Sequence, residues 1–259
     1  MTWIRRWNSG AGARIRLICL PHAGGSASFY RPWAALLPPE AELLGVQYPG
    51  REDRLQDPMI DTMGELVTAL ADALPPLLDR PYALFGHSMG SAVAWELAHE
   101  LSRRGAPQPR RMFVSGRAAP HTAVAGDVHR RDDDVLCAEL RRLGGTSGEV
   151  LDDPGLRSLV LGIVRNDYRL IETYRPDVRP LLDCPVHVLT GADDPELDRE
   201  RVLERAGGWA DLTTARTEVR TFPGDHFYLT PRRREVVATV LRRMDPSLIT
   251  GGQTWPSTP

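Results

Sequence analysis

The sequence predicts an α/β fold built on a mostly parallel central sheet with helices on both faces. Apolar, strand-like runs alternate with helical patterns along most of the 259 residues, which is typical of consecutive βα units. The apolar runs are nearly continuous, as expected for parallel strands that are buried on both sides. With 42% hydrophobic residues, the chain is long enough to bury one large core. Because no Pro-, Gly- or Ser-rich linker divides it, we expect a single domain over residues 1–259.

Individual elements follow from the periodicity of the apolar residues. Short apolar runs bounded by Gly, Pro or polar residues predict strands, and patterns with a period near 3.6 predict the helices between them. The predicted strands cover residues 15–20, 42–47, 82–85, 111–115, 185–190 and 218–222. The predicted helices include 28–37, 59–77, 90–104 and 231–243. In parallel sheets of this kind, functional residues gather at the carboxyl ends of the strands.

One long segment interrupts the alternation. From about residue 119 to residue 182 the sequence shows only helical patterns, over 135–143, 156–164 and 169–174. An insertion of this length between two core strands is typically functional, and we expect a helical lid over the active site. A helical decoration without a gating role is the alternative. The last residues, 250–259, predict a disordered tail.

Charge and cysteine content exclude several classes of function. A formal net charge of -2 gives no bulk attraction to nucleic acid or to an anionic membrane. All 32 basic residues are arginine, so chemistry that uses a lysine nucleophile or base is excluded. Cys19, Cys137 and Cys184 show no CxxC spacing and are expected to be buried, reduced thiols of a cytoplasmic protein. Neither a signal-peptide pattern nor an apolar stretch of about eighteen residues is found, so secretion and membrane spanning are not expected.

The strongest functional signal lies in the stretch YALFGHSMGSAVAWELA, residues 82–98. An apolar run leads into Gly86-His87-Ser88-Met89-Gly90, and a helical pattern follows, which is the strand-turn-helix context of a nucleophile elbow. Glycines are needed where a Cβ would collide with the neighbouring strand or helix. Ser88 is therefore the candidate nucleophile, and an ordinary Gly/Ser turn is the alternative.

A serine nucleophile needs a base and an orienting carboxylate, which are expected in the chain order Ser, Asp, His. Asp194 follows the predicted strand at 185–190 and is the candidate acid, because Pro195 restricts it to extended geometry. Asp193 is the second choice, and the alternative for both is a simple turn role. His226, in a Pro-Gly-Asp-His turn after the last predicted strand, is the candidate base.

The remaining histidines show no metal-site pattern. His87, beside the nucleophile, is expected to pack or to hydrogen-bond inside the elbow. No pair of histidines has an HxH or HxxxH spacing, so no metal is expected. The other five are interpreted as surface or strand residues: His22, His99, His121, His129 and His187.

The loop after the first predicted strand is the candidate second half of an oxyanion hole. Its sequence, PHAGGS, consists mainly of small residues that let the backbone approach a ligand closely. The amides of Ala23 and Met89 are the predicted donors to an oxyanion. A tight loop made by Gly24 and Gly25 without this role is the alternative. The dinucleotide fingerprint GxGxxG is absent from this loop.

Together these segments resemble the type II thioesterases that accompany modular polyketide synthases and non-ribosomal peptide synthetases, within the α/β-hydrolase fold. The elbow is generic to that fold, whereas YPGRE, RLGGT and the spacing between them are more specific. The resemblance runs from Trp3 to about Met244. The segments that carry it are RLICLPHAGGSASFYRPW, VQYPGREDR, FGHSMG, RLGGTSGEVLDDPGL, RNDYRLIETY, TGADDP and PGDHFYL.

The resemblance implies an enzyme that hydrolyses acyl thioesters from the phosphopantetheine arm of acyl or peptidyl carrier proteins. The sequence leaves the oligomeric state open, with a monomer as the default expectation. It implies that Ser88 is the nucleophile, His226 the base and Asp194 the orienting acid, with the amides of Ala23 and Met89 as the oxyanion hole. No cofactor is implied beyond the phosphopantetheine of the substrate. The family more often has alanine where Asn166 stands, a difference in the lid region that bears on acyl-chain preference.

Three other functions share these motifs. An esterase or acyl-CoA thioesterase acting on small free substrates has the same fold and triad, because fold does not fix substrate. An acyltransferase with an alcohol or amine acceptor also shares the nucleophile motif. A catalytically idle hydrolase fold acting as a binding partner is the third. An intact set of Ser88, Asp194 and His226 argues against it, because binding alone needs none of them.

Overall fold

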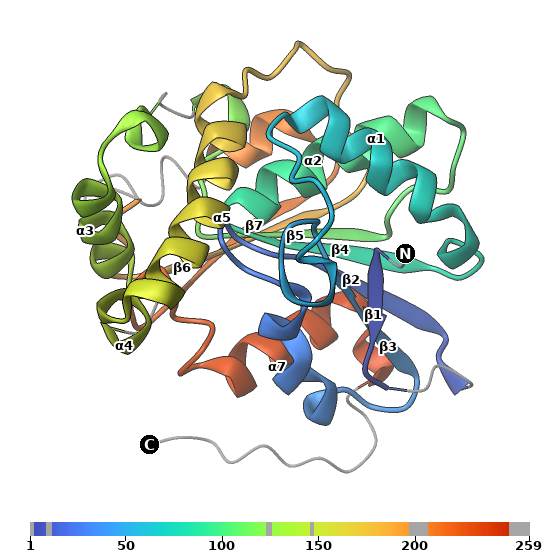
Figure 1. Cartoon of the computed structure of the whole chain (residues 1–259). Coiled ribbons are helices and arrows are strands. Elements are labelled where there is room, and N and C mark those ends of the chain that lie inside the picture. Colours follow the sequence, from blue (N-terminus) through green and yellow to red (C-terminus); the bar gives the residue numbers. More distant parts are fainter. Residues whose placement is uncertain (1–2, 9–11, 123–125, 146–147, 197–206, 249–259) are drawn as a thin grey trace.

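Seven strands form one sheet in the order β1-β3-β2-β4-β5-β6-β7 (Figure 1). The computed structural model describes residues 3–8, 12–122, 126–145, 148–196 and 207–248. Strand β1 pairs antiparallel with β3, and all other neighbouring strands are parallel. The strands are β1 (Ile4–Arg6), β2 (Ile15–Leu20), β3 (Ala41–Val46), β4 (Tyr82–His87), β5 (Arg111–Ser115), β6 (Val186–Gly191) and β7 (Thr217–Phe222). The predicted mostly parallel sheet is confirmed.

All six predicted strands are present, with ends displaced by two residues at most. Every residue of β2, β3, β4 and β6 is buried, which accounts for their continuous apolar sequences. Arg16 in β2 and Glu42 in β3 are charged but also buried, and they form an ion pair with an N–O distance of 2.7 Å. Strand β1 is not predicted, because three residues of sequence IRR carry no periodic signal.

Different helices cover the two faces of the sheet. On one face lie α1 (Met63–Ala73) and α2 (Met89–Arg103), where Leu70 and Val93 share an apolar cluster with Leu84 of β4. On the other face lie α7 (Arg233–Met244) and a 3-10 helix (Ala27–Leu36), where Trp33 and Val237 share a cluster with Phe85. The prediction of helices on both faces is therefore confirmed, and both layers are visible above and below the sheet in Figure 1.

Two predicted helices differ from the structure, and proline accounts for the form of the first and for the end of the second. The segment predicted as a helix at 28–37 is a 3-10 helix with Pro32 inside it. The helix predicted at 59–77 begins only at Met63 and ends at Ala73, and Pro75–Leu77 form a separate 3-10 turn. Proline lacks the N–H that an α-helix interior requires, so neither segment continues as a regular α-helix.

The helical segment after β5 contains α3 (Asp133–Leu143), α4 (Gly148–Asp152) and α5 (Pro154–Thr173). The helices predicted at 156–164 and 169–174 are one continuous helix, α5. Asp153 accepts from the Leu156 amide at 2.8 Å and Pro154 occupies the first turn, so the start of α5 is well specified. Leu140, Leu161 and neighbouring side chains form a separate apolar cluster. No strand occurs in the described part of 119–182.

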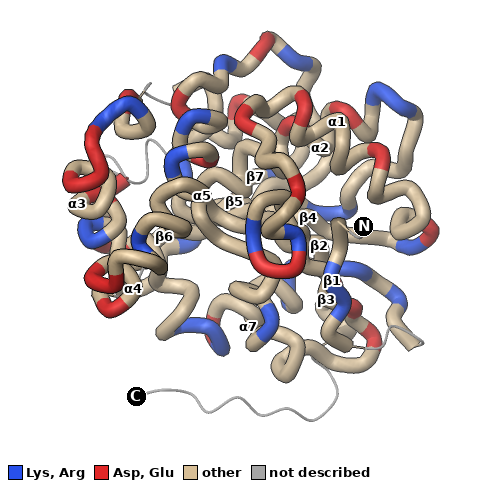
Figure 2. Tube along the Cα trace, in the orientation of Figure 1, with Lys and Arg blue, Asp and Glu red and all other residues tan. Residues whose placement is uncertain are grey.

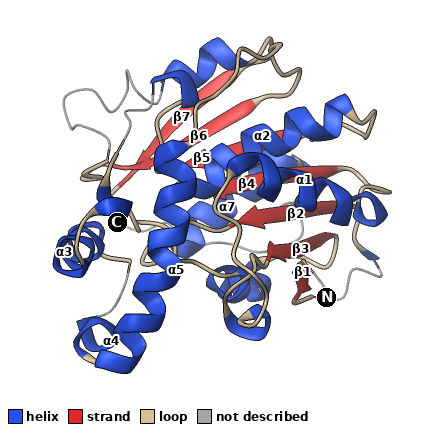
Figure 3. Cartoon of the chain, turned by 45° about the horizontal axis from the view of Figure 1, so that its top comes forward, coloured by secondary structure: helices blue, strands red, loops and turns tan. Residues whose placement is uncertain are grey.

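These helices lie at the carboxyl edge of the sheet, where the functional loops are expected. In Figure 3 the arrow of β2 points towards α5. The loops that leave this edge contain the sequence-predicted residues Ala23, Ser88, Asp194 and His226. Acidic and basic residues are interspersed over the helices (Figure 2). In α3 Asp133 and Asp134 lie in the first turn and Arg141 and Arg142 in the last, as favoured by the helix dipole.

Candidate active site

Ser88 is the single residue that joins β4 to α2. Its backbone has φ 52° and ψ -119°, a conformation that residues with a side chain rarely adopt. The Ser88 N–H donates to the Ser115 carbonyl at 2.7 Å, which ties the turn to β5. The turn is shorter than predicted, because Gly86 belongs to β4 and Gly90 to α2. This strained connection matches the expected nucleophile elbow.

The two glycines of the elbow occupy positions with no room for a side chain. A Cβ on Gly86 would lie 2.2 Å from the Gly90 carbonyl oxygen. A Cβ on Gly90 would lie 2.1 Å from the Leu20 carbonyl oxygen. Both neighbours are backbone atoms, which cannot turn away as a flexible side chain can. The elbow therefore depends on the close approach of β2, β4 and α2.

His226 and Asp194 are hydrogen-bonded to each other. The Nδ1 of His226 lies 3.0 Å from each carboxylate oxygen of Asp194, and both side chains are almost fully buried. Because a carboxylate only accepts, Nδ1 carries the proton and Nε2 is left as an acceptor. The Glu196 amide also donates to Asp194 at 2.9 Å, which fixes the carboxylate. Asp193, the second choice for the acid, is exposed, and its amide donates to the Gly224 carbonyl at 2.9 Å.

Ser88 and His226 lie on the wall of one cavity of about 350 Å³. No direct hydrogen bond joins the Ser88 hydroxyl to His226 in the described structure, and contacts of this kind tighten when substrate binds. Ala23 and Met89 line the same cavity. The apolar part of its wall comes from α3, α5 and the His226 loop, with Leu140, Leu143, Val160, Val164, Ile171 and Phe227.

The predicted oxyanion donors lie on two separate elements. Met89 is the first residue of α2, where the amide has no acceptor within the helix and the helix dipole favours negative charge. Ala23 lies in the loop after β2. The next two amides of that loop are occupied, since Gly24 N–H donates to Asp167 at 2.8 Å and Gly25 N–H donates to the His22 carbonyl at 2.9 Å.

A buried ion pair holds this loop, and neither partner is in the predicted site. The Arg51 guanidinium donates to both carboxylate oxygens of Asp167, at 2.6 and 2.9 Å, and to the Gly25 carbonyl at 3.0 Å. Asp167, on α5, accepts the Gly24 amide with the same carboxylate. Arg51 and Asp167 are 4% and 2% exposed. The pair thus connects helix α5, the loop after β3 and the loop after β2, which contains Ala23 and is called the oxyanion loop below.

A second contact between the same two loops comes from Glu52. Its backbone has φ 49°, a strained value for a residue with a side chain. Its carboxylate accepts from the hydroxyls of Ser26 and Ser28, at 2.6 and 3.0 Å. The YPGRE segment therefore supports the oxyanion loop through two consecutive residues. The YPGRE sequence marks the family, but it does not reveal the partners of Arg51 and Glu52. Those partners lie more than 20 residues away in the chain, so no local sequence pattern contains them.

Two further histidines lie beside His226. His87 is buried, with its Nδ1 3.0 Å from Ser115 Oγ, which confirms the expected hydrogen bond inside the elbow. His22 is not a surface or strand residue as predicted, because its ring packs edge-on against Phe29 and Phe227 in the cavity wall. Burial lowers the pKa of His22 to about 3 and the pKa of His87 below its ordinary value. Both rings are therefore neutral at neutral pH.

Other predicted features are placed as follows. His187 is a strand residue of β6, as expected. Cys19, Cys137 and Cys184 are buried and free, which confirms the expectation of thiols. Burial raises the pKa of Cys19 above its ordinary value and that of Cys184 to about 11.

Among the described residues no cluster of potential metal ligands occurs, and none of the described helices has the length and apolar composition to cross a bilayer. The tail at 250–259 lies outside the described residues.

Asn166 is not among the residues that line the cavity, and its bearing on acyl-chain preference stays a prediction. Its amide donates to the Ile60 carbonyl at 2.8 Å and to Asp167 at 3.3 Å. It therefore faces the loop before α1 and supports the carboxylate of Asp167.

Comparisons with known proteins agree with this geometry. The thioesterase domain family matches residues 15–244. The chain is 44% identical over 246 residues to a probable cadicidin biosynthesis thioesterase of Streptomyces griseus, covering 94% of this chain and 66% of that protein. It is 40% identical over 253 residues to the thioesterase PikA5 of Streptomyces venezuelae, and the match covers 96% of this chain and 87% of PikA5.

Solved structures give the same result. The type II thioesterase BorB from the borrelidin biosynthetic cluster superposes with a TM-score of 0.85 at 41% identity, covering 93% of this chain and 97% of BorB. RedJ, a thioesterase from the prodiginine pathway of Streptomyces coelicolor, has a TM-score of 0.83 at 39% identity, and the match covers 90% of this chain and 87% of RedJ. Human thioesterase 2, at 22% identity and a TM-score of 0.64, shares the fold, with 93% of this chain and all of that chain covered.

Substitution of Gly86 by alanine is expected to destabilise the fold. The new Cβ would meet backbone atoms of α2, and overpacking of this kind costs about 1–3 kcal/mol or more. Gly162→Ala in α5 is the control, because a Cβ there meets nothing within 4 Å. It is expected to stabilise by about 0.5–1 kcal/mol. Urea unfolding followed by circular dichroism measures both, and equal stability of Gly86→Ala and wild type would contradict the close approach.

Asp194→Asn is expected to lower kcat for an activated acyl ester by about 10³- to 10⁴-fold, because an amide at this position favours the wrong tautomer of His226. Asp193→Asn is the matched control and is expected to retain most of the activity. Steady-state kinetics of the two purified variants decide between the neighbouring aspartates. A large loss with Asp193→Asn alone would reverse the assignment.

Asp167→Asn is expected to lower kcat by about 10-fold or more with little change in KM, because a displaced oxyanion loop weakens transition-state binding. It is also expected to lower the free energy of unfolding by about 3 kcal/mol, since Arg51 loses its buried partner. Asp134→Asn is the control, because it removes an exposed ion pair with Arg157 of the same helix and leaves the Arg51 contact in place. A folded Asp167→Asn protein with wild-type kcat would show that the ion pair has no part in positioning the loop.

Proposed function

Because the chain belongs to the thioesterase family, we propose that it hydrolyses acyl thioesters from the phosphopantetheine arm of carrier-protein domains. The pathway would be polyketide or non-ribosomal peptide biosynthesis, and the role editing or product release. One observation carries the proposal for the chemistry: His226, which is hydrogen-bonded to Asp194, and Ser88 on its strained turn line one cavity. The biosynthetic names and structures of the relatives support the substrate class.

In the proposed mechanism Ser88 is the nucleophile. Its Oγ forms a bond to the thioester carbonyl carbon while Nε2 of His226 takes the hydroxyl proton. Collapse of the tetrahedral intermediate breaks the C–S bond, and His226 returns the proton to the leaving pantetheine thiolate. Water, activated by the same nitrogen, then hydrolyses the acyl-serine and releases the acid. Asp194 holds the ring and stabilises the imidazolium form that arises in both steps.

The oxyanion formed in each step requires donors that are already oriented. The amides of Ala23 and Met89 are proposed for this role, because both residues line the cavity with Ser88, one from the loop after β2 and one from the start of α2. Each donor of this kind typically contributes about 2.7–4 kcal/mol to transition-state stabilisation. The Arg51–Asp167 pair supports the Ala23 side, because Asp167 holds the adjacent Gly24 amide.

Neutral His22 and His87 favour this chemistry. A positive charge beside His226 would oppose its protonation, and both neighbouring rings have pKa values lowered by burial, with smaller effects from His226. The His87 ring lies 4.9 Å from that of His226. The neighbouring rings of His22 and His87 therefore carry no charge, and Asp194 is the carboxylate that contacts the base.

The acyl chain is proposed to occupy the cavity beneath α3 and α5. Apolar side chains from these helices line it, so they would cover the acyl group and exclude water, which is the role expected for a lid. The segment at about 119–182 belongs, on this proposal, to a single catalytic domain. No cofactor is proposed, since the phosphopantetheine arrives with the substrate.

The substrate proposal is tested by hydrolysis of one acyl group on a phosphopantetheinylated carrier protein and on CoA. We expect faster release from the carrier, because the proposed partner contributes docking contacts that CoA lacks. Ser88→Ala is expected to lower the rate on both by at least about 10³-fold, because the acyl-enzyme cannot form. Equal or faster release from CoA would indicate an acyl-CoA thioesterase. Absence of release from both substrates would contradict thioester hydrolysis altogether.

A further inference from the structure

An arginine that the proposed mechanism does not use lies on the cavity wall next to the reacting groups. Arg117 follows Gly116 at the carboxyl end of β5, and both line the cavity. Gly116 has φ 61°, and a Cβ there would lie 3.1 Å from Cε1 of His226. The chain therefore passes directly beside the base, and the next side chain along it is a guanidinium group.

The backbone of Arg117 is held, whereas no partner of its guanidinium occurs among the described residues. The Arg117 carbonyl accepts from Nε1 of Trp209 at 2.9 Å. The Nε of Arg117 is buried, and within the described part of the chain no acceptor bonds to it and no carboxylate forms an ion pair with this side chain. Burial lowers the pKa of the guanidinium, an effect that the charge of Glu196 partly offsets. A buried donor without an acceptor is costly, so a ligand that supplies the acceptor gains free energy from this site.

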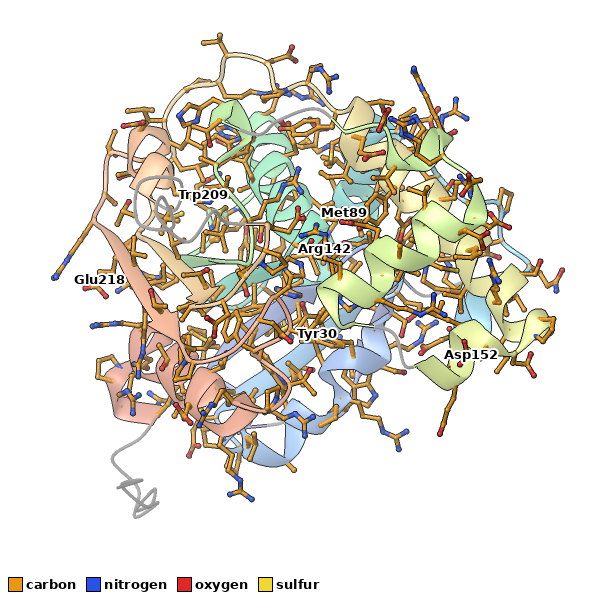
Figure 4. The ribbon with its side chains drawn as sticks, turned by 90° about the vertical axis from the view of Figure 1, so that its left-hand side faces the viewer. Tyr30, Met89, Arg142, Asp152, Trp209 and Glu218 are labelled. Atoms are coloured by element: carbon orange, nitrogen blue, oxygen red, sulfur yellow. The ribbon has the colours of Figure 1, made fainter. Side chains whose placement is uncertain are left out.

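The carboxylates of the same wall are already paired. Glu139 and Glu196 both accept from Arg142 of α3, Glu139 at 2.6 Å. Glu172 accepts from the His129 amide at 2.9 Å and contacts its ring nitrogen at 2.6 Å. Figure 4 faces this side of the molecule, with Arg142 over the same central region as Met89 and Asp152 away from it. Of the described residues that line the cavity, Arg117 is the only arginine.

We propose that Arg117 is a specificity-determining residue that binds a neutral acceptor oxygen, a carbonyl or a hydroxyl, on the acyl chain close to the thioester. This inference rests on the proposed function. Acyl groups such as 3-oxoacyl chains would then be preferred over unsubstituted alkanoyl chains. The guanidinium would donate to the acyl oxygen through N–H groups that have no partner within the described protein.

The position and charge of the site favour a neutral acyl oxygen over the phosphate of the pantetheine arm and over a carboxylate on the acyl chain. The phosphate of a pantetheine arm is many bonds away from the thioester carbonyl, whereas Arg117 is one residue from the glycine packed on His226. A carboxylate on the acyl chain would meet the negative charges of Glu139, Glu172 and Glu196, which line the same cavity. A neutral oxygen satisfies the guanidinium without that repulsion.

The test compares butyryl, 3-oxobutyryl and malonyl thioesters, each on the carrier protein and on N-acetylcysteamine, which lacks the phosphate. The proteins are wild type, Arg117→Met, Arg117→Lys and the control Arg141→Met, an exposed arginine of α3 outside the cavity that pairs with Asp152. The readout is kcat/KM for 3-oxobutyryl relative to butyryl, compared between wild type and variant so that intrinsic reactivity cancels. We expect Arg117→Met to reduce this ratio by roughly 10-fold or more on both carriers. Arg117→Lys is expected to lose less, and Arg141→Met nothing.

The remaining outcomes each decide against the proposal. If Arg117→Met leaves the ratio unchanged, the role proposed for Arg117 is wrong. Hydrolysis of the butyryl thioester by wild type would still support the proposed function. An equal loss on all acyl groups, seen only with the carrier, assigns Arg117 to the phosphate. A malonyl rate that falls more than the 3-oxobutyryl rate assigns it to a carboxylate. Wild type that hydrolyses none of the thioesters overturns the proposed function together with this inference.

Discussion

The structure depends on the close approach of β2, β4 and α2 at the carboxyl edge of the sheet. Carbonyl groups of Leu20 and Gly90 occupy the space where any side chain at Gly90 or Gly86 would lie. That approach forces Ser88 into its strained conformation and lifts it out of the strand. The same geometry brings the N-terminus of α2 to face the loop after β2. The candidate nucleophile and both candidate oxyanion donors thus follow from one packing constraint, and their positions are interdependent.

The second organising contact connects parts of the chain that are distant in sequence. Arg51 and Asp167 are 116 residues apart, and together they hold the backbone of Gly24 and Gly25. A buried pair of this kind stabilises little by itself, but loss of either partner is costly. Its value here lies in orientation, because it fixes the oxyanion loop against a helix that also lines the cavity. Helix α5 therefore both lines the cavity and holds the loop after β2 in place.

The sequence predicts the sheet and the candidate triad because both leave local signals. Buried parallel strands are continuously apolar, the elbow has a compact motif, and Pro195 singles out Asp194, whose side chain contacts His226. What the sequence does not predict depends on distant partners. His22 is mistaken for a surface or strand residue because its burial comes from Phe29 and Phe227. The roles of Arg51, Asp167 and Arg117 follow from contacts, or their absence, that no spacing rule contains. Strand β1 is too short and polar for a periodic signal.

The burial of all three cysteines has a consequence for an enzyme whose proposed substrates are thioesters. A thiolate exchanges acyl groups with a thioester, so an accessible cysteine would become acylated in competition with Ser88. Cys19 lies in β2, a few residues before the oxyanion loop, yet it is fully buried and burial raises its pKa. Cys137 and Cys184 are buried as well. On the proposed mechanism this burial would protect the protein from self-acylation, because Ser88 lines the cavity and the three cysteines do not.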